Sequence, residues 1–273
     1  MNRGHNWRRG CKGLAAAALL TFGLSFAVTA AAEEEEPPHI VFLVSEDEHN
    51  YEAHQTIPPY AQWLEEDHGF RTSVIQGEGE PTAHHFPDLE IITEADLVVV
   101  FFRRRALSEE QLGLITGYLE EGNPLVGIRT ANHAFAVREN VEGEIAEGYE
   151  DWHAFVPDIL GCENRGYGPV APGTQVAPAD GAEDHPILEG VEPLGWWSEG
   201  NVYHVAPLVD QEAEVILMGS VEDDIEPIAW TRWTADGAPV FYTSLGHPSD
   251  FERSPFRTLL LNGIRWVLEQ AEP

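Results

Sequence analysis

Residues 123–137 read NPLVGIRTANHAFAV, and this stretch decides the expected fold. The apolar run at 124–128 is typical of a buried strand, and a polar cluster follows it where a strand would pass into a helix. The cluster contains Arg129, Thr130, Asn132 and His133. In α/β proteins, ligands bind at such strand exits, because loops and helix N-termini with free N–H groups converge there. We therefore expect the ligand site at this corner.

Apolar runs and amphipathic segments flank this stretch on both sides. Continuous apolar runs predict strands that are buried on both faces, and helical spacing of apolar residues predicts helices. The expected strands are residues 39–45, 70–76, 96–102, 124–128, 201–205, 214–220, 227–232 and 239–244. The expected helices are residues 57–67, 109–121, a short one from 151 toward 160, and 255–269. This order predicts one large α/β domain over residues 39–273.

The N-terminus has the pattern of a secretory signal peptide over residues 1–32. Basic residues precede an apolar run at 14–28, and small residues follow at 29–32. The run is short for a membrane span, although an uncleaved anchor is the alternative. Residues 33–38 are acidic and end in two prolines, which predicts a disordered lead. We expect a secreted or periplasmic protein with no membrane association after signal cleavage.

The chain carries a large excess of negative charge, with a formal net charge of −32 at pH 7. Its only lysine, Lys12, lies within the expected signal peptide. Such a surface repels nucleic acid and anionic lipid, so neither is an expected partner. We interpret the charge as a solvated surface rather than as a docking site for a cationic partner.

Three other expected strands also end in polar residues. The strand at 39–45 runs into Glu46, Asp47, Glu48 and His49, the strand at 96–102 runs into Arg103, Arg104 and Arg105, and the strand at 239–244 is followed by His247. Because the carboxyl ends of parallel strands meet at one edge, we expect these groups near Arg129 and His133. The three arginines are either a clamp for a ligand or a counterweight to the carboxylates at 46–48.

Several motifs, in this order along the chain, resemble the ThuA-like (trehalose utilisation) family. They are GIRTANHAF at 127–135, HPILEGV at 185–191, PIAW at 227–230 and TSLGHP at 243–248, together with the charged triplets at 46–48 and 103–105. The resemblance covers essentially the whole mature chain. It implies a class I glutamine amidotransferase-like fold, which is a single domain with a flavodoxin-like, doubly wound, mostly parallel sheet.

The amidotransferases carry a cysteine nucleophile at the turn from strand to helix. Here Arg129, Thr130 and Ala131 occupy that turn, so glutamine amidotransferase chemistry is excluded. Many ThuA-like proteins have a histidine where this chain has Arg129. In this chain His133, one helical turn further on, is the nearest imidazole that could take its place.

The resemblance implies a role in carbohydrate catabolism, with a 3-keto-glycoside or a related oxidised sugar as substrate. Imidazoles, carboxylates and arginines can move protons on such a sugar, because histidine titrates near neutrality. The expected catalytic residues are His133 or His247 as the base, Glu48 as its partner, and Arg129 or Arg105 at the developing oxyanion. The expected substrate-binding residues are Glu46, Arg103, Arg105, Thr130, Asn132 and Trp197.

Two alternatives to this chemistry stay open. Glu48, His133 and His247 could bind a divalent metal ion, which would make the reaction metal-assisted, whereas no nucleotide cofactor is expected. The protein could also be a non-catalytic carbohydrate-binding or surface interaction module, in which the same corner and aromatic residues hold a glycan without turnover.

Overall fold

The computed structural model describes residues 36–271. The predicted signal peptide at 1–32 and residues 33–35 of the predicted acidic lead lie outside the described residues. Residues 36–38 are exposed and have no regular secondary structure. Within 36–271, no helix combines the length and the apolar character that a membrane span requires.

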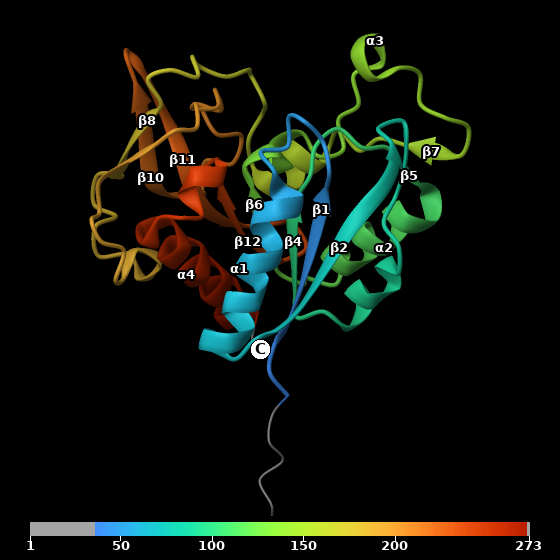
Figure 1. Ribbon diagram of the computed structural model, residues 1–273, viewed down its shortest axis with the longest axis horizontal. Helices are drawn as coiled ribbons and strands as arrows, with labels where there is room; N and C mark the ends of the chain where they lie inside the picture. The colour runs from blue at the N-terminus through green and yellow to red at the C-terminus, as the bar shows by residue number, and fades with distance from the viewer. Residues whose placement is uncertain (1–35, 272–273) are drawn as a thin grey trace, which may run out of the picture. The chain divides into compact units, whose positions relative to one another are not determined.

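A large mixed sheet runs through the domain (Figure 1). Its strand order is β7-β5-β3-β2-β1-β4-β6-β12-β11-β10-β8-β9. The central strands are β2 (Arg71–Glu80), β1 (His39–Ser45), β4 (Leu97–Phe101), β6 (Leu125–Ile128) and β12 (Pro239–Thr243), and each is parallel to its neighbours among them. Every residue of β1, β4, β6 and β12 is buried, as expected for strands covered on both faces.

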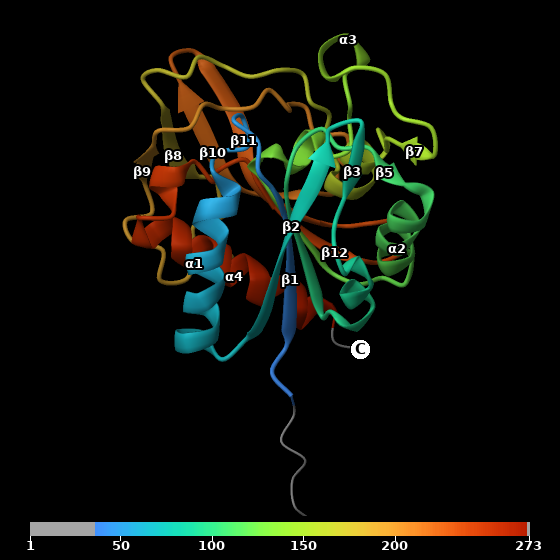
Figure 2. The same cartoon turned by 45° about the vertical axis from the view of Figure 1, so that its right-hand side comes forward.

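Further strands extend this parallel core at both ends (Figure 2). Beyond β12, successive antiparallel pairs join β11 (Asp224–Trp233), β10 (Glu214–Val221), β8 (Thr174–Pro178) and β9 (Trp196–Ser198). Beyond β2 come β3 (Ala83–His85), β5 (Leu107–Ser108) and β7 (Tyr149–Glu150), of which β3 and β5 are parallel. The sheet is therefore parallel where the predicted site lies and mixed at its ends.

Helices cover both faces of the sheet and divide the core into two layers. On one face α1 (Ala53–His68) and α4 (Ser254–Ala271) pack on alternate residues of β1, including Phe42. On the other face α2 (Glu109–Glu120) and the π-helical segment η3 (Phe155–Leu160) belong to the layer that contains Leu43. Because successive side chains of β1 point to opposite faces of the sheet, this strand contributes residues to both layers. The short helical segments are η1 (Leu89–Glu94), η2 (Arg129–His133), α3 (Glu139–Glu142), η4 (Pro186–Leu188) and η5 (Pro248–Asp250).

Most of the predicted elements are present, with shifted ends. The helix predicted at 57–67 begins earlier, at Ala53, so Pro58 and Pro59 lie inside it rather than in its first turn. The strand predicted at 201–205 is wrong, because only Tyr203 forms an isolated bridge, to Tyr167. β8 lies at the end of a glycine- and proline-rich stretch in which no strand was predicted, and β9 was not predicted either.

Candidate functional site

The predicted site residues follow parallel strands that end at the upper edge of the sheet in Figure 1. Four non-glycine residues beyond these strands have a left-handed backbone: Tyr51 (φ 50°) and Glu52 (φ 51°) after β1, Arg104 (φ 50°) after β4, and Arg129 (φ 45°) after β6. Such conformations cost about 1–3 kcal/mol each and persist where the surrounding structure enforces them, typically at ligand sites. The strand exits are therefore held in conformations that their own residues disfavour.

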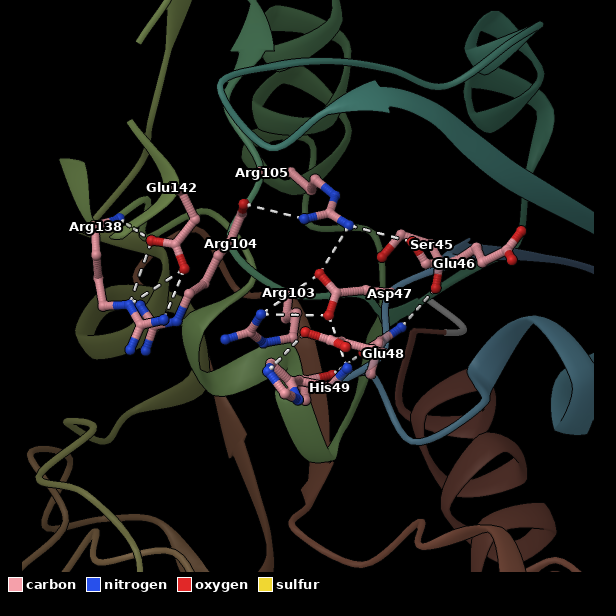
Figure 3. A network of polar contacts seen from close by, with 12 residues as sticks. Ser45, Glu46, Asp47, Glu48, His49, Arg103, Arg104, Arg105, Arg138 and Glu142 are labelled. Atoms are coloured by element: carbon pink, nitrogen blue, oxygen red, sulfur yellow. Dashed lines mark hydrogen bonds and ion pairs between the residues drawn. The ribbon is translucent and has the colours of Figure 1, made fainter. Parts of the chain in front are cut away.

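Asp47 organises the exits of β1 and β4 (Figure 3). Its carboxylate points between two guanidinium groups, at 3.4 Å from Arg103 Nη1 and 3.1 Å from Arg105 Nη2. Arg103 and Arg105 are 9% and 3% exposed. Burial alone raises the pKa of Asp47, but the His49 backbone N–H, Arg103 and Arg105 outweigh it, so the pKa lies below its ordinary value. Of the two roles predicted for the arginines, the structure shows the counterweight, and the partner is Asp47.

Asn50 and Thr130 form a second connection between strand exits. Asn50 Nδ2 donates to the carbonyl oxygens of Ser45 (2.9 Å) and Phe101 (3.0 Å), which end β1 and β4. Asn50 Oδ1 accepts a hydrogen bond from Thr130 Oγ1 at 2.6 Å. All these polar groups are buried, so each hydrogen bond satisfies a group that water cannot reach. Thr130, predicted to bind substrate, is therefore engaged within the protein.

Arg129 is a buried residue whose guanidinium is occupied by the protein. The residue is 1% exposed, Nη1 donates to the Ser244 carbonyl oxygen at 2.6 Å, and Nη2 donates to Asn201 Oδ1 at 2.8 Å. Its Cζ lies 3.9 Å from the ring centroid of Tyr51 and 5.0 Å from that of Tyr203. These cation–π contacts are strong because the group is desolvated. The guanidinium of Arg129, predicted to be catalytic, is therefore engaged by contacts within the protein.

The Arg129 guanidinium is the centre of a row of rings that ends in the two predicted histidines. The Tyr51 ring lies 6.1 Å from the His247 ring, and the Tyr203 ring lies 6.0 Å from the His133 ring. His247 and His133 therefore belong to different sides of Arg129. Each histidine lines its own cavity, and no cavity is lined by both.

His133 lines a cavity of about 400 Å³. The other lining residues are Arg104, Asn132, Ala136, His153, Val156, Pro157, Glu163 and Asn164. His133 Nδ1 contacts both Asn132 Oδ1 and Asn164 Nδ2. In the tautomer in which Nδ1 donates to Asn132 Oδ1, Nε2 carries the lone pair, and in the other tautomer Nδ1 accepts from Asn164 Nδ2. Asn164 Nδ2, near both atoms, also donates to Asn132 Oδ1 at 3.4 Å. Among residues 36–271, Nε2 has no hydrogen-bond partner.

Two polar atoms of the residues lining this cavity have unsatisfied hydrogen-bonding capacity. Asn132 is 0% exposed, and its Nδ2 has no hydrogen-bond partner; Arg104 Nε is likewise buried without one. Buried donors in native proteins are nearly always paired, and leaving one unpaired costs about 1–3 kcal/mol. Both residues line the same cavity as His133, which makes this cavity the candidate site. We refer to this space as the His133 cavity.

The His133 cavity is electropositive although the protein is strongly acidic. Burial lowers the pKa of His133 well below its ordinary value, and Arg104, Arg103 and Arg138 lower it further. The imidazole is therefore neutral at physiological pH. Burial and Arg138 lower the pKa of Arg104 to about 10, which leaves its guanidinium charged. Figure 3 shows Glu142 between Arg138 and Arg104, and Arg138 Nη2 lies 2.7 Å from Glu142 Oε1.

His247 and Glu48 line a smaller cavity of about 280 Å³, together with His49, Tyr51, Glu52 and Pro248. His247 begins η5, and its Nδ1 accepts the Ser249 backbone N–H, so Nε2 carries the proton of the neutral ring. Burial and Arg129 lower its pKa. The Glu48 side chain is 85% exposed, and its Oε1 lies 3.3 Å from Nε2 of His49.

The remaining predicted residues lie apart. Within 36–271, no group of three histidine, cysteine or acidic side chains is placed to hold a metal ion, so Glu48, His133 and His247 do not form the ligand set considered above. Glu46 is exposed and accepts a hydrogen bond from Gln76. Trp197 lies on β9, where its indole donates to the Pro172 carbonyl oxygen at 2.9 Å. Neither residue lines the His133 cavity.

Sequence reasoning predicted a site at this edge of the sheet, but it did not single out several of the residues described above. Asp47 was seen only as part of an acidic triplet, and Arg104 only as part of a basic one. Asn164 was not singled out, because it lies in a glycine-rich loop without periodicity, and Asn201 was considered only as the first residue of the strand predicted at 201–205. Arg104 had one usable signal, since it is the middle residue of a triplet that directly follows a buried strand.

The fold and the polar strand exits define an α/β protein with a candidate ligand site at the carboxyl edge of a parallel sheet. The sequence model of the ThuA family, described as trehalose utilisation, matches residues 41–267. The chain belongs to this family.

Two solved structures of ThuA-like proteins share the fold. One, from Bacteroides uniformis ATCC 8492, has a TM-score of 0.62 and 18% sequence identity, over 87% of this chain and 94% of that chain. The other, from Parabacteroides merdae ATCC 43184, has a TM-score of 0.59 and 16% identity, over 85% of this chain and 90% of that chain. No curated protein sequence matches the chain. At these sequence identities, the two structures support the fold but not the chemistry, which has to be argued from the residues of the site.

Proposed function

We propose that this protein is a sugar-modifying enzyme whose active site is the His133 cavity, and that its substrate is a 3-keto-glycoside or a related oxidised sugar. One observation carries the proposal: Asn132 Nδ2 and Arg104 Nε are buried without partners, and both residues line one cavity together with His133. A sugar oxygen is the acceptor that both donors lack. The trehalose utilisation family supports carbohydrate as the ligand class.

The charge around the cavity favours an anionic intermediate. Four arginines lower the pKa of His133, and the same positive field would stabilise an enolate. Classical glycoside hydrolysis instead passes through a positively charged oxocarbenium ion and uses a pair of carboxyl groups. Glu163 is the only carboxylate residue among those that line the cavity, and its side chain is 58% exposed. The site therefore suits enolisation next to a ketone.

In the proposed step, His133 Nε2 takes the proton from the carbon next to the ketone. The electron pair of the broken C–H bond forms the enolate, and Arg104 and Asn132 hold the resulting oxyanion. When the enolate collapses, the carbonyl is restored, a carbon–carbon double bond forms and the β glycosidic C–O bond breaks. The departing oxygen takes the proton from His133. If the glycosidic bond does not break, return of the proton gives exchange or epimerisation.

The test is an NMR time course with 3-ketotrehalose and related 3-keto-glycosides in D₂O. The expected result is deuterium exchange at the α-carbon, with or without bond cleavage, that His133→Ala abolishes. His204→Ala is the matched control, because that imidazole pairs with Asp224 outside the cavity. His247→Ala is expected to retain exchange. Loss of exchange in His247→Ala but not in His133→Ala would refute the assignment of the cavity.

A non-catalytic carbohydrate-binding module is the competing function. In that case wild-type protein would broaden the ligand signals without exchanging any proton. We also propose that the chain is exported through residues 1–32. For the fold, the helices on both faces and the central order β2-β1-β4-β6-β12 support the flavodoxin-like, amidotransferase-like class.

A further inference from the structure

A second and larger cavity lies beside the His133 cavity. Its volume is about 720 Å³, and its lining includes Thr116, Glu120, Trp152, Asp210, Trp233 and Asp236. Glu120 ends α2, and Asp236 lies in the turn that precedes β12. This space is therefore at the amino end of β12, whereas the predicted site residues follow the carboxyl ends of the strands. We refer to it as the Trp233 cavity.

Two tryptophans that line the Trp233 cavity pack against other aromatic rings. Trp233 is 46% exposed, and its ring packs against Trp266 with the ring centroids 5.2 Å apart. Trp152 packs in the same way against Phe155, also at 5.2 Å. An aromatic ring that is fixed by packing loses little conformational freedom when a ligand stacks on it. Such rings are suited to the apolar face of a pyranose.

The polar lining of this cavity offers many hydrogen-bond acceptors and excludes anionic ligands. Arg232, 9% exposed, is neutralised by Asp210, whose Oδ2 lies 2.7 Å from its Nε, and it also donates to the carbonyl oxygen of Ile159 at 2.7 Å. Glu120 and Asp236 supply further carboxylates that can accept hydrogen bonds from hydroxyl groups. A neutral ligand rich in hydroxyl groups satisfies this lining.

The two cavities meet at one residue. Pro157 of η3 lines both of them. Shortly before it in the chain, Trp152 lines the Trp233 cavity and His153 lines the His133 cavity. A strand of five residues such as β12 spans about 17 Å, which gives the separation of the two sheet edges. A ligand that reached from one edge to the other would be longer than a disaccharide.

We propose that the Trp233 cavity is a second carbohydrate subsite, and that one extended neutral glycan binds across Pro157 with its oxidised end at His133. This inference rests on the proposed function for the position of the oxidised end. The stacking subsite itself depends only on Trp233, Trp152 and the carboxylates around them. The protein would then act on oligosaccharides in preference to disaccharides.

The test measures glycan binding by calorimetry and turnover by NMR on the same mature protein. The probes are cellobiose and cellohexaose, with maltose and maltohexaose as a second linkage. At least one of the two hexasaccharides is expected to bind more tightly than the disaccharide of the same linkage, by about tenfold or more. Trp233→Ala is expected to remove this gain in affinity, because one stacked aromatic contact changes the dissociation constant about tenfold. Trp233→Phe should restore part of it. Trp197→Ala is the matched control, since Trp197 is 40% exposed and lines neither cavity.

The results separate this inference from the proposed function. His133→Ala should lose exchange activity on 3-ketotrehalose, whereas Trp233→Ala should lose the length-dependent gain in affinity. Equal affinity of wild type for short and long glycans, no binding of either, or full affinity in Trp233→Ala would overturn the second subsite. Absence of exchange in wild type, with length-dependent binding intact, would overturn only the catalytic proposal and the placement of the oxidised end.

Discussion

Replacing Asp47 by asparagine is the sharpest test of the network at the strand exits. The change keeps the shape of the side chain but removes the charge that Arg103 and Arg105 share, and their side chains are 11% and 4% exposed. Breaking a buried ion pair by removing one partner costs about 3–5 kcal/mol. Because the Asp47 side chain keeps 12% exposure, we expect a loss of about 3 kcal/mol in the free energy of unfolding.

Glu48→Gln is the matched control for this experiment. It removes the same charge one residue away, but its side chain is 85% exposed, so the free energy of unfolding should change by less than about 0.5 kcal/mol. Both changes reduce the overall repulsion of the acidic chain equally, and the comparison cancels that effect. Urea unfolding at unchanged m value gives both numbers. A loss for Asp47→Asn below about 1 kcal/mol, or equal to that of Glu48→Gln, would refute the reasoning.

The same pair predicts a pH dependence with a definite sign. The pKa of Asp47 is lowered in the folded protein, so the folded state favours the carboxylate. Its contribution is complete above the ordinary aspartate pKa and is lost as pH falls through the lower folded value. The difference in unfolding free energy between wild type and Asp47→Asn should therefore be constant from pH 8 to about 5 and shrink below about pH 4. A difference that grew on acidification would contradict this sign.

Four further predictions concern stability and the pH dependence of activity. Gly200→Ala should destabilise the fold by about 1–3 kcal/mol in urea unfolding, because its Cβ would lie 2.8 Å from Nη1 of the fixed Arg129 guanidinium. Gly117→Ala, inside α2 with nothing within 4 Å of the new atom, should instead stabilise it by about 0.5–1 kcal/mol. Asn50→Ala should cost about 3 kcal/mol, since two buried carbonyl oxygens lose their donor. Exchange activity should stay level from pH 8 to 6, because the pKa of His133 is well below 6.5; a decline centred at 6.5 would contradict a neutral His133.

The parallel core could be predicted from the sequence because its strands obey simple patterns. β1 and β4 are continuous apolar runs, and Ser108 marks the start of α2 by accepting the Gln111 N–H, as the capping pattern predicts. Polar residues after each of these strands predicted a site at one edge of the sheet. These signals are local, so a single sequence displays them.

The side-chain directions at that edge could not be predicted. Beyond the last residue of a strand no periodicity applies, so nothing in the sequence distinguishes the inward Asp47 from the outward Glu46 and Glu48. The left-handed backbone at Arg129 accompanies a guanidinium that lies in the interior, where arginine is rarely found. The role of Arg129 is set by Tyr51 and Tyr203, which come from distant parts of the chain.

The buried connections between β1, β4 and β6 have a consequence for the thermodynamics of binding. Asn50 ties three strand exits together, and Asp47 fixes two of them, so these segments are already ordered before any ligand arrives. Ligand binding therefore costs little conformational entropy for ordering the loops at these exits. A sugar, whose hydroxyl groups gain only modest free energy on leaving water, can be retained by such a preorganised edge with few contacts.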